Sequence, residues 1–244
     1  MAISYFPSSA DAARYRRLRG LGRALNERIL QTVPSRAFDE IAESLGVRRN
    51  GILIFATEDM TGVLADSCLY DWYEDGKNVV QQYAEAHPAK PGTDEAYLLA
   101  AYCRAKYRLL ATQSAVPDSG LYCFDALNRE ELFLMDQAFS HSLTTEATAV
   151  LATRTVPLGP YWMTGGAALP VVSSEELRSA SRQIEKRLTR DTDEGPAPFP
   201  TLIIRACLNA GAAEHIVYSG AGSMLKERPR IPSPPGSKRR PRLI

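Results

Sequence analysis

Carboxylates and aromatic rings gather in one short segment of the first half of the chain, which reads ADSCLYDWYEDG from Ala65 to Gly76. Spaced carboxylates can bind a cation or act as a general acid and a general base. This acidic-aromatic patch consists of Asp66, Tyr70, Asp71 and Trp72. Because no glycine-framed loop joins the carboxylates, the favoured interpretation is a solvated helix face whose aromatic end packs under a neighbouring element.

Basic side chains gather at the two ends of the chain, although the overall net charge is only +1. Residues 1–33 carry a net charge of +4 and residues 226–244 a net charge of +6, so the body between them is acidic. Such ends can bind the body, another protein or a polyanion, and charge alone does not choose among these partners. The candidate binding residues are Arg14, Arg16, Arg17, Arg19, Lys238, Arg239, Arg240 and Arg242.

The N-terminal arginines, with Arg23 among them, crowd the first half of a helix predicted over 9–32. Cations near a helix N-terminus are unfavourable because the N-terminal end of the helix dipole is positive. These charges therefore require a compensating partner. The acidic body is the first candidate, and a nucleic-acid backbone or an acidic partner protein is the alternative.

The C-terminal segment, 226–244, combines seven basic residues with five prolines, which predicts a disordered tail. Its cations could contact phosphates without sequence preference. Since the tail has no interleaved aromatic residues for base stacking, it implies no base recognition. A solvated tail, or a tether onto the acidic body, is the favoured interpretation.

Motifs that would name a reaction are absent. The chain has no phosphate-binding loop, no dinucleotide fingerprint, no nucleophile elbow and no H-E-x-x-H motif. His141 lies beside two serines at the end of a strand predicted over 131–140, and a polar strand end is its favoured role. The Gly165-Gly166 pair could bind an anion, but a bulge or a bend in a barrel is favoured.

The four cysteines are far apart and form no C-x-x-C pair, so buried thiols are favoured over metal ligands. No cofactor and no metal are predicted. No apolar run approaches the ~18 residues of a membrane span, and the first residues lack the apolar segment of a signal peptide. We therefore expect a cytoplasmic protein without a membrane contact.

Hydrophobic periodicity predicts an α+β fold with a helical N-terminal half, a small antiparallel sheet or barrel, C-terminal helices and the basic tail. Helices are expected over 9–32, 35–45, from Thr57 onward, over 79–86 and over 94–111, with another opened by Ser173 and a last one, only slightly favoured over a strand, at 201–211. Strands are expected over 120–127, 131–140, 149–158 and 161–172. We expect four regions: a helical region over 1–113, the β unit over 114–172, the C-terminal helices over 173–225 and the basic tail over 226–244.

The strand segments also carry a resemblance. The runs ELFLMDQAFSHSL and VLATRTVPLGPYWMTGGAALPV, with Leu69-Tyr70-Asp71 upstream, resemble a group of uncharacterised bacterial proteins over about residues 35–175. Some similar proteins end in a zinc-binding SEC-C motif, Pro-Cys-Pro-Cys-Gly-Ser. Here Ser233 and Pro235 occupy the cysteine positions, so zinc binding is not implied. The resemblance implies a fold and no activity.

The sequence thus favours a non-catalytic binding or regulatory protein, with the sheet as scaffold and the charged ends as contact sites. One alternative is an accessory nucleic-acid-binding protein that uses the basic helix and the tail. The other is an enzyme of unknown reaction, with a site at the junction of helix and sheet built from Asp66, Asp71 and His141.

Overall fold

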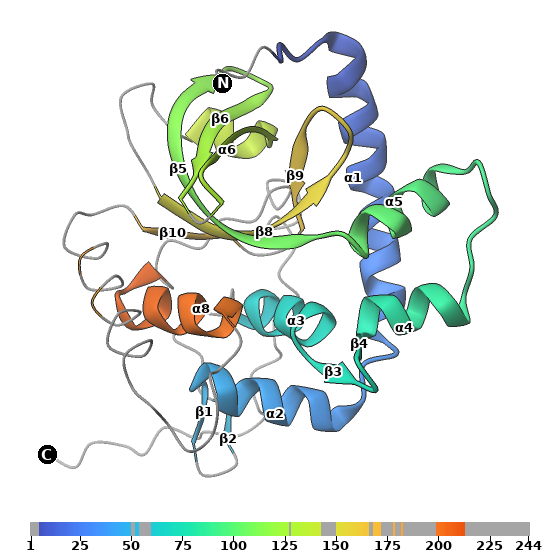
Figure 1. The fold of residues 1–244 in the computed structure, drawn as a ribbon, viewed down its shortest axis with the longest axis vertical. Coiled ribbons are helices and arrows are strands. Elements are labelled where there is room, and N and C mark those ends of the chain that lie inside the picture. Colours follow the sequence, from blue (N-terminus) through green and yellow to red (C-terminus); the bar gives the residue numbers. More distant parts are fainter. Residues whose placement is uncertain are drawn as a thin grey trace, which may run out of the picture.

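The structure, a computed structural model, is a small closed barrel with helices packed around it, which confirms the α+β class (Figure 1). The described residues are 5–49, 52–53, 60–126, 128–142, 150–165, 168–171, 178, 182 and 199–212. The basic tail, most of the helix predicted from Ser173, and Gly166 lie outside them. No helix of the described residues combines the length and apolar character needed to cross a membrane.

Five strands of the described residues form the barrel, and the last of them closes it. They are β5 (Lys106–Val116), β6 (Gly120–Asp125), β7 (Glu130–Met135), β8 (Val150–Pro157) and β9 (Trp162–Thr164). They pair in the order β8-β5-β6-β7-β9, and β9 also pairs with β8. The β7–β9 pair is parallel and the other pairs are antiparallel. A further strand, β10 (Leu169–Val171), pairs with the first half of β8.

Tight turns fix the register of the hairpins. Asp118 lies between β5 and β6 at φ 58°, and Arg129 lies between β6 and β7 at φ 55°. Gly120 begins β6 where two strands come close together, because a Cβ atom there would lie 2.1 Å from the carbonyl oxygen of Leu134. This position therefore admits no side chain.

Strand alternation separates two apolar cores. One fills the barrel and includes Leu110, Leu121 and Leu151. The other lies between the barrel and the helices, and the β8 residues Ala152 and Val156 face it. Because successive strand residues point to opposite faces, β8 contributes to both cores.

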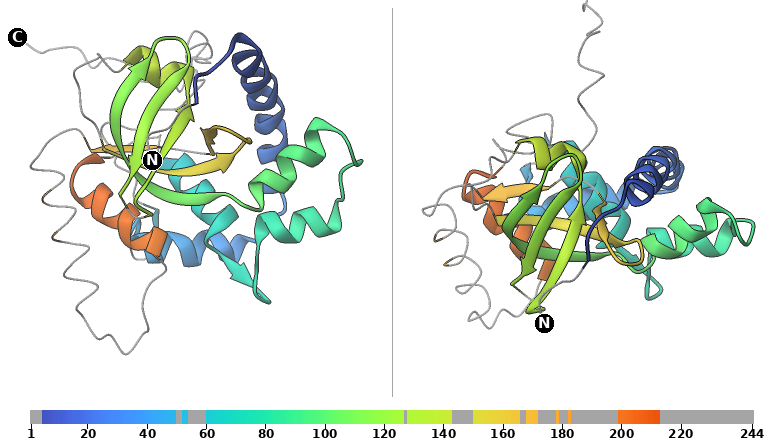
Figure 2. Two further views of the ribbon diagram at one scale, coloured as in Figure 1. Left: turned by 45° about the horizontal axis from the view of Figure 1, so that its top comes forward. Right: turned by 90° about the horizontal axis from the view of Figure 1, so that it is seen from above.

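The helices of the described residues cover one side and one end of the barrel. They are α1 (Ser9–Leu30), α2 (Ser35–Leu45), α3 (Met60–Tyr70), α4 (Val79–Ala86), α5 (Asp94–Tyr102), α6 (Gln137–Ser142) and α8 (Phe199–Asn209). Two short strand pairs, β1 (Arg48–Arg49) with β2 (Ile52–Leu53) and β3 (Tyr73–Glu74) with β4 (Lys77–Asn78), connect them. Helices α3 and α8 lie below the barrel in Figure 1, with α2 beneath both. Figure 2 shows α1 and the α4–α5 pair together at one side of the barrel.

Local sequence signals explain the ends of the first helices. Ser8 and Asp11 form a capping box that begins α1, and the buried stripe of α1 includes Leu18, Leu25 and Ile29. Gly46 ends α2 in the left-handed conformation, as the sequence indicates. The last predicted helix is confirmed as α8, and three of the four cysteines are buried while Cys103 is half-buried.

Two predicted elements extend too far, and the strand predicted over 161–172 is instead two strands, β9 and β10. The helix predicted to run to Ala111 ends at Tyr102, and residues from Lys106 onward form β5, so the expected division after residue 113 falls within a strand. This segment pairs on one side with β6 and on the other with β8, and these partners override its helix-forming leucines and alanines. The strand predicted over 131–140 ends at Met135, and α6 follows it.

Candidate functional site

The arginines of α1 face two different neighbours. The Arg14 guanidinium lies 4.5 Å from the ring centroid of Tyr97, and the Nε of Arg17 lies 2.7 Å from a carboxylate oxygen of Asp94. Both partners belong to α5. The expected pairing with the acidic body is therefore observed at Arg17, although so exposed an ion pair contributes about 1 kcal/mol or less to stability.

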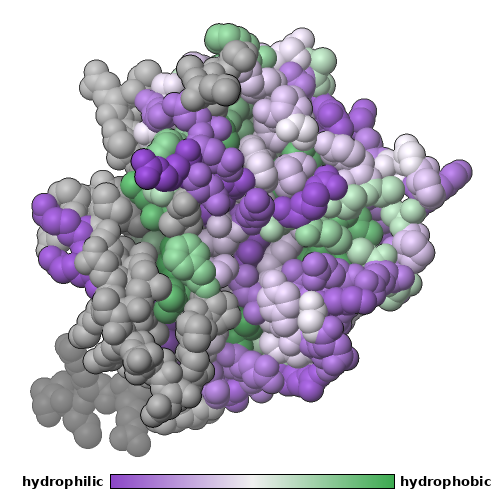
Figure 3. Space-filling model, in the orientation of Figure 1, coloured by the Kyte–Doolittle hydropathy of each residue, from purple (hydrophilic) through white to green (hydrophobic). Residues whose placement is uncertain are grey.

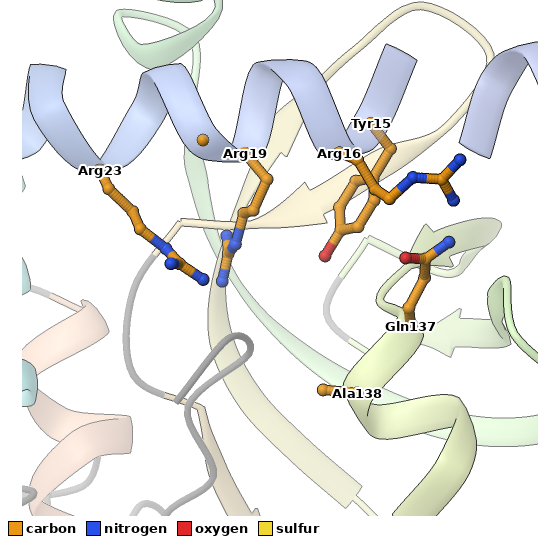
Figure 4. A pocket seen from close by; sticks show the side chains of 7 residues that line it. Tyr15, Arg16, Arg19, Arg23, Gln137 and Ala138 are labelled. Carbon is orange, nitrogen blue, oxygen red and sulfur yellow. The ribbon is translucent and has the colours of Figure 1, made fainter. Parts of the chain in front are cut away.

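The other arginines of α1 line a pocket between α1 and α6. Arg16, Arg19 and Arg23 are spaced by three and four residues, which places them on one face of the helix. The pocket has a volume of about 310 Å³, and its other described lining residues are Tyr15, Gly20, Gln137 and Ala138. Figure 4 shows the guanidinium groups of Arg19 and Arg23 converging beneath α1, with Arg16 turned toward Gln137.

Tyr15 adds a hydroxyl group to this arginine pocket, and Figure 4 shows its oxygen pointing into the same space. The ring is buried, with 4% of the residue exposed. Burial, with the nearby Asp136 carboxylate, raises the pKa of Tyr15 to about 12, although Arg19 and Arg23 act in the opposite direction. The phenol is therefore a neutral hydrogen-bond donor at neutral pH.

The back of the arginine pocket is tied to the barrel. Arg19 donates to the carbonyl oxygen of Thr164, the last residue of β9. The Thr164 hydroxyl donates to Oδ2 of the buried Asp136 at 2.9 Å, and Oδ1 of Asp136 accepts from the backbone N–H of Phe139 at 3.1 Å. Among the described residues, three arginines thus line the pocket, and the Asp136 carboxylate behind it already accepts two hydrogen bonds. Guanidinium and phenol N–H and O–H groups are donors, so this lining suits the oxygen atoms of an anion.

The acidic-aromatic patch is buried, and the predicted solvated helix face is wrong. Arg154 of β8 donates from Nε to Asp66 at 3.1 Å and from a terminal nitrogen to Asp71 at 2.6 Å. The exposed fractions of the side chains are 4% for Arg154, 8% for Asp66 and 5% for Asp71. The Arg154 guanidinium also lies 4.5 Å from the ring centroid of Tyr70. Trp72 is buried as well and donates from Nε1 to Glu40 at 2.8 Å.

Burial changes the proton affinity of this cluster. It raises the pKa of Asp66 to about 6, against the opposing effect of Arg154, and Asp71 adds to the rise. Burial also raises the pKa of Asp71, again against the effect of Arg154. Both carboxyl groups are therefore more readily protonated than exposed aspartates.

A second pocket, of about 400 Å³, opens beside this cluster. Its described lining includes Tyr70, Asp71, Tyr107 and Arg154, with Tyr73, Asn78, Ala105, Lys106, Asn128, Phe199 and Pro200 around them. We call it the tyrosine pocket. In Figure 3 the hydrophilic surface of this face is interrupted by hydrophobic atoms over α8 and over the α4–α5 pair.

His141 lies on a different element from the aspartates. It belongs to α6, which packs on β6 at the top of the barrel in Figure 1, whereas Asp66 lies in α3 below the barrel. Among the described residues, no group of three or more His, Cys, Asp and Glu side chains is placed to hold a metal ion. Gly165, after β9, donates its backbone N–H to the carbonyl of Arg154, and a Cβ atom there would lie 3.1 Å from the Arg154 side chain. This close approach gives the glycine at 165 a structural reason that does not require a bound anion.

Sequence reasoning missed the pocket residues Tyr15 and Gln137 and the central role of Arg154. The helical spacing of Arg16, Arg19 and Arg23 was a usable signal, because it separates them from Arg14 and Arg17 on the helix surface. The tail residues Lys238, Arg239, Arg240 and Arg242 lie outside the described residues.

Comparison with known proteins identifies a family for this chain but does not identify an activity. The sequence pattern described as "Family of unknown function (DUF7986)" matches residues 9–195, a range that contains α1, Asp66, Asp71 and Arg154. No curated protein and no solved structure matches the chain. Because the family match covers well over half of the sequence, the chain belongs to DUF7986, a family of unknown function.

Proposed function

We propose that this protein is a non-catalytic binding module that holds a small phosphorylated molecule, or phosphate itself, in the arginine pocket. The observation that carries the proposal is that Arg19 and Arg23 converge beneath α1 near the Tyr15 hydroxyl, in a pocket that Arg16 also lines. Like charges three and four residues apart on a helix repel each other. An anion bound in the pocket would weaken this repulsion and accept hydrogen bonds from the donors that line it.

The size and the donors of the pocket favour a phosphate group. A volume of about 310 Å³ is at the small end of ligand pockets, so it suits a small molecule. A guanidinium group can donate two parallel hydrogen bonds to two phosphate oxygens. A phosphate dianion has enough acceptor oxygens for several guanidinium groups. A single carboxylate carries less charge and fewer acceptors.

A nucleic-acid backbone is a weaker candidate for α1. A long polyanion needs a row of cations along the surface, but Arg14 and Arg17 are engaged by α5 on another face of the helix. Arg16, Arg19 and Arg23 line a pocket and form no such row, which favours a compact ligand.

Isothermal titration calorimetry with inorganic phosphate and with pyrophosphate tests the proposal. Arg19→Gln and Arg23→Gln should each weaken binding by about tenfold or more, because each removes a charge-assisted hydrogen bond. Arg17→Gln is the matched control, since it removes the same charge from the same helix outside the pocket, and it should leave the affinity within about twofold.

Three results would argue against the proposal. The first is an absence of binding by both anions. The second is an equal loss in the Arg17 and Arg19 variants, which would indicate a general charge effect. The third is tighter binding of a single-stranded oligonucleotide than of pyrophosphate at matched ionic strength, with a steep dependence on salt.

A further inference from the structure

The tyrosine pocket has features that the arginine pocket lacks. Its inner wall is made of buried charges, and its rim carries two of the large apolar side chains that the described surface leaves exposed. These are Tyr73 of β3 and Phe199 of α8, with 58% and 42% of each residue exposed. The pocket therefore combines buried charged groups at its inner wall with exposed aromatic side chains at its opening.

Two tyrosine hydroxyl groups at this pocket have no hydrogen-bond partner among the described residues. The oxygen atoms of Tyr70 and Tyr107 are both buried, and both residues line the pocket. Tyr70 has only 4% of its surface exposed. A buried hydroxyl without a partner is unfavourable, so each such group in a folded protein requires an explanation. A ligand in the pocket would supply the missing partner.

The buried charges do not balance. Asp66 and Asp71 provide two carboxylates, whereas Arg154 provides one guanidinium, and all three are at most 8% exposed. Arg154 and Asp71 are the charged groups that act on Asp66. Lys106 is a cation at the rim, but it is exposed, so water screens its charge more than that of the buried groups.

We propose that the tyrosine pocket binds an organic cation: an amine attached to an aromatic or apolar body. The ammonium group would lie against the Asp71 carboxylate and donate to a tyrosine oxygen. The apolar body would pack between the aromatic residues of the rim, where the rings also favour a nearby positive charge. This site is separate from the arginine pocket and does not depend on the function proposed for it.

Three probes of similar shape and different charge distinguish this ligand class from others. They are phenethylamine, the neutral 2-phenylethanol and the anionic phenylacetate, followed by chemical-shift changes in NMR spectra of the full chain. The amine should bind at least about tenfold more tightly than the neutral probe, because only the amine compensates the unbalanced carboxylate. Phenylacetate should bind more weakly still.

Two variants of opposite sign make the test independent of folding defects. Asp71→Asn should abolish the preference for the amine, and Lys106→Gln, at the exposed rim, should strengthen amine binding by about two- to fivefold. Asp94→Asn is the control, since Asp94 is an exposed aspartate on α5 away from the pocket, and it should change nothing. A folded Lys106→Gln protein that binds the amine no better than the wild type would count against the proposal.

The pH dependence is a further readout. Burial raises the pKa of Asp66 to about 6, so amine binding should strengthen as the pH rises from about 5 to about 8 while the amine stays protonated. Equal binding of the amine and the neutral alcohol at all pH values, or no binding of any of the three probes, would overturn the proposal.

Discussion

Arg154 lies between two buried carboxylates, whereas Arg16, Arg19 and Arg23 surround a pocket whose other described lining residues carry no charge. The first arrangement joins α3 to β8, two elements far apart in the sequence. The second leaves several cations together at a surface. A buried guanidinium between two carboxylates contributes to the fold, while arginines that line a cavity are also suited to a ligand.

The largest effect should come from Arg154→Ala. The substitution leaves Asp66 and Asp71 buried without their counter-ion, which should lower the free energy of unfolding by about 3–5 kcal/mol. Urea denaturation followed by circular dichroism measures this. If the free energy of unfolding fell by less than about 1 kcal/mol, Arg154 would contribute no more to stability than the surface arginines do.

The next effect concerns the pH dependence of stability. The pKa of Asp66 is higher in the folded state than its ordinary value of 3.8, so its contribution to stability is fully present below about pH 4 and is lost as the pH rises through about 6. This loss should amount to at most about 3 kcal/mol. Denaturation of the wild type and of Asp66→Asn across this range should show a smaller decline in the variant. Parallel pH profiles would contradict the assignment.

Tyr15→Phe should separate packing from binding in the arginine pocket. The ring stays in the core, so the free energy of unfolding should change by less than about 1 kcal/mol. Loss of the hydroxyl donor should weaken phosphate binding by about fivefold. Calorimetry and denaturation of the same sample test both parts, and unchanged affinity would remove Tyr15 from the site.

Arg16→Gln should have the smallest effect on stability, within about 0.5 kcal/mol, and its direction should be a slight gain because the repulsion from Arg19 decreases. The same variant should bind phosphate more weakly. A clear loss of stability would show that Arg16 contributes to the fold in the way that Arg154 does.

Local signals in the sequence were sufficient for most helices and for the hairpins. The cap at Ser8, the left-handed Gly46 and the apolar stripe of α1 act within a few residues, so they can be read from the chain alone. The segment 106–111 could not be predicted this way, because its strand conformation depends on pairing with β8, whose paired residues lie 39 to 49 positions later.

The same distance in sequence explains what was missed at the two pockets. Asp66 and Asp71 were predicted to lie on a solvated helix face. The sequence does not reveal that Arg154, 88 and 83 residues away, is their partner. Tyr15 and Gln137 come together only when α1 packs beside α6. The common face of Arg16, Arg19 and Arg23 follows from helical spacing alone. The α1 side of the arginine pocket could therefore be predicted from the sequence.

The closure of the barrel by β9 has a consequence during synthesis of the chain. Until Trp162–Thr164 has left the ribosome, β7 lacks its parallel neighbour and β8 lacks its partner at Thr155–Pro157. Two strand edges then carry unpaired backbone groups, which are templates for pairing with another chain. Nascent or truncated chains that end before residue 162 should therefore aggregate more readily than chains that extend past β10, and they are the forms that most need a chaperone.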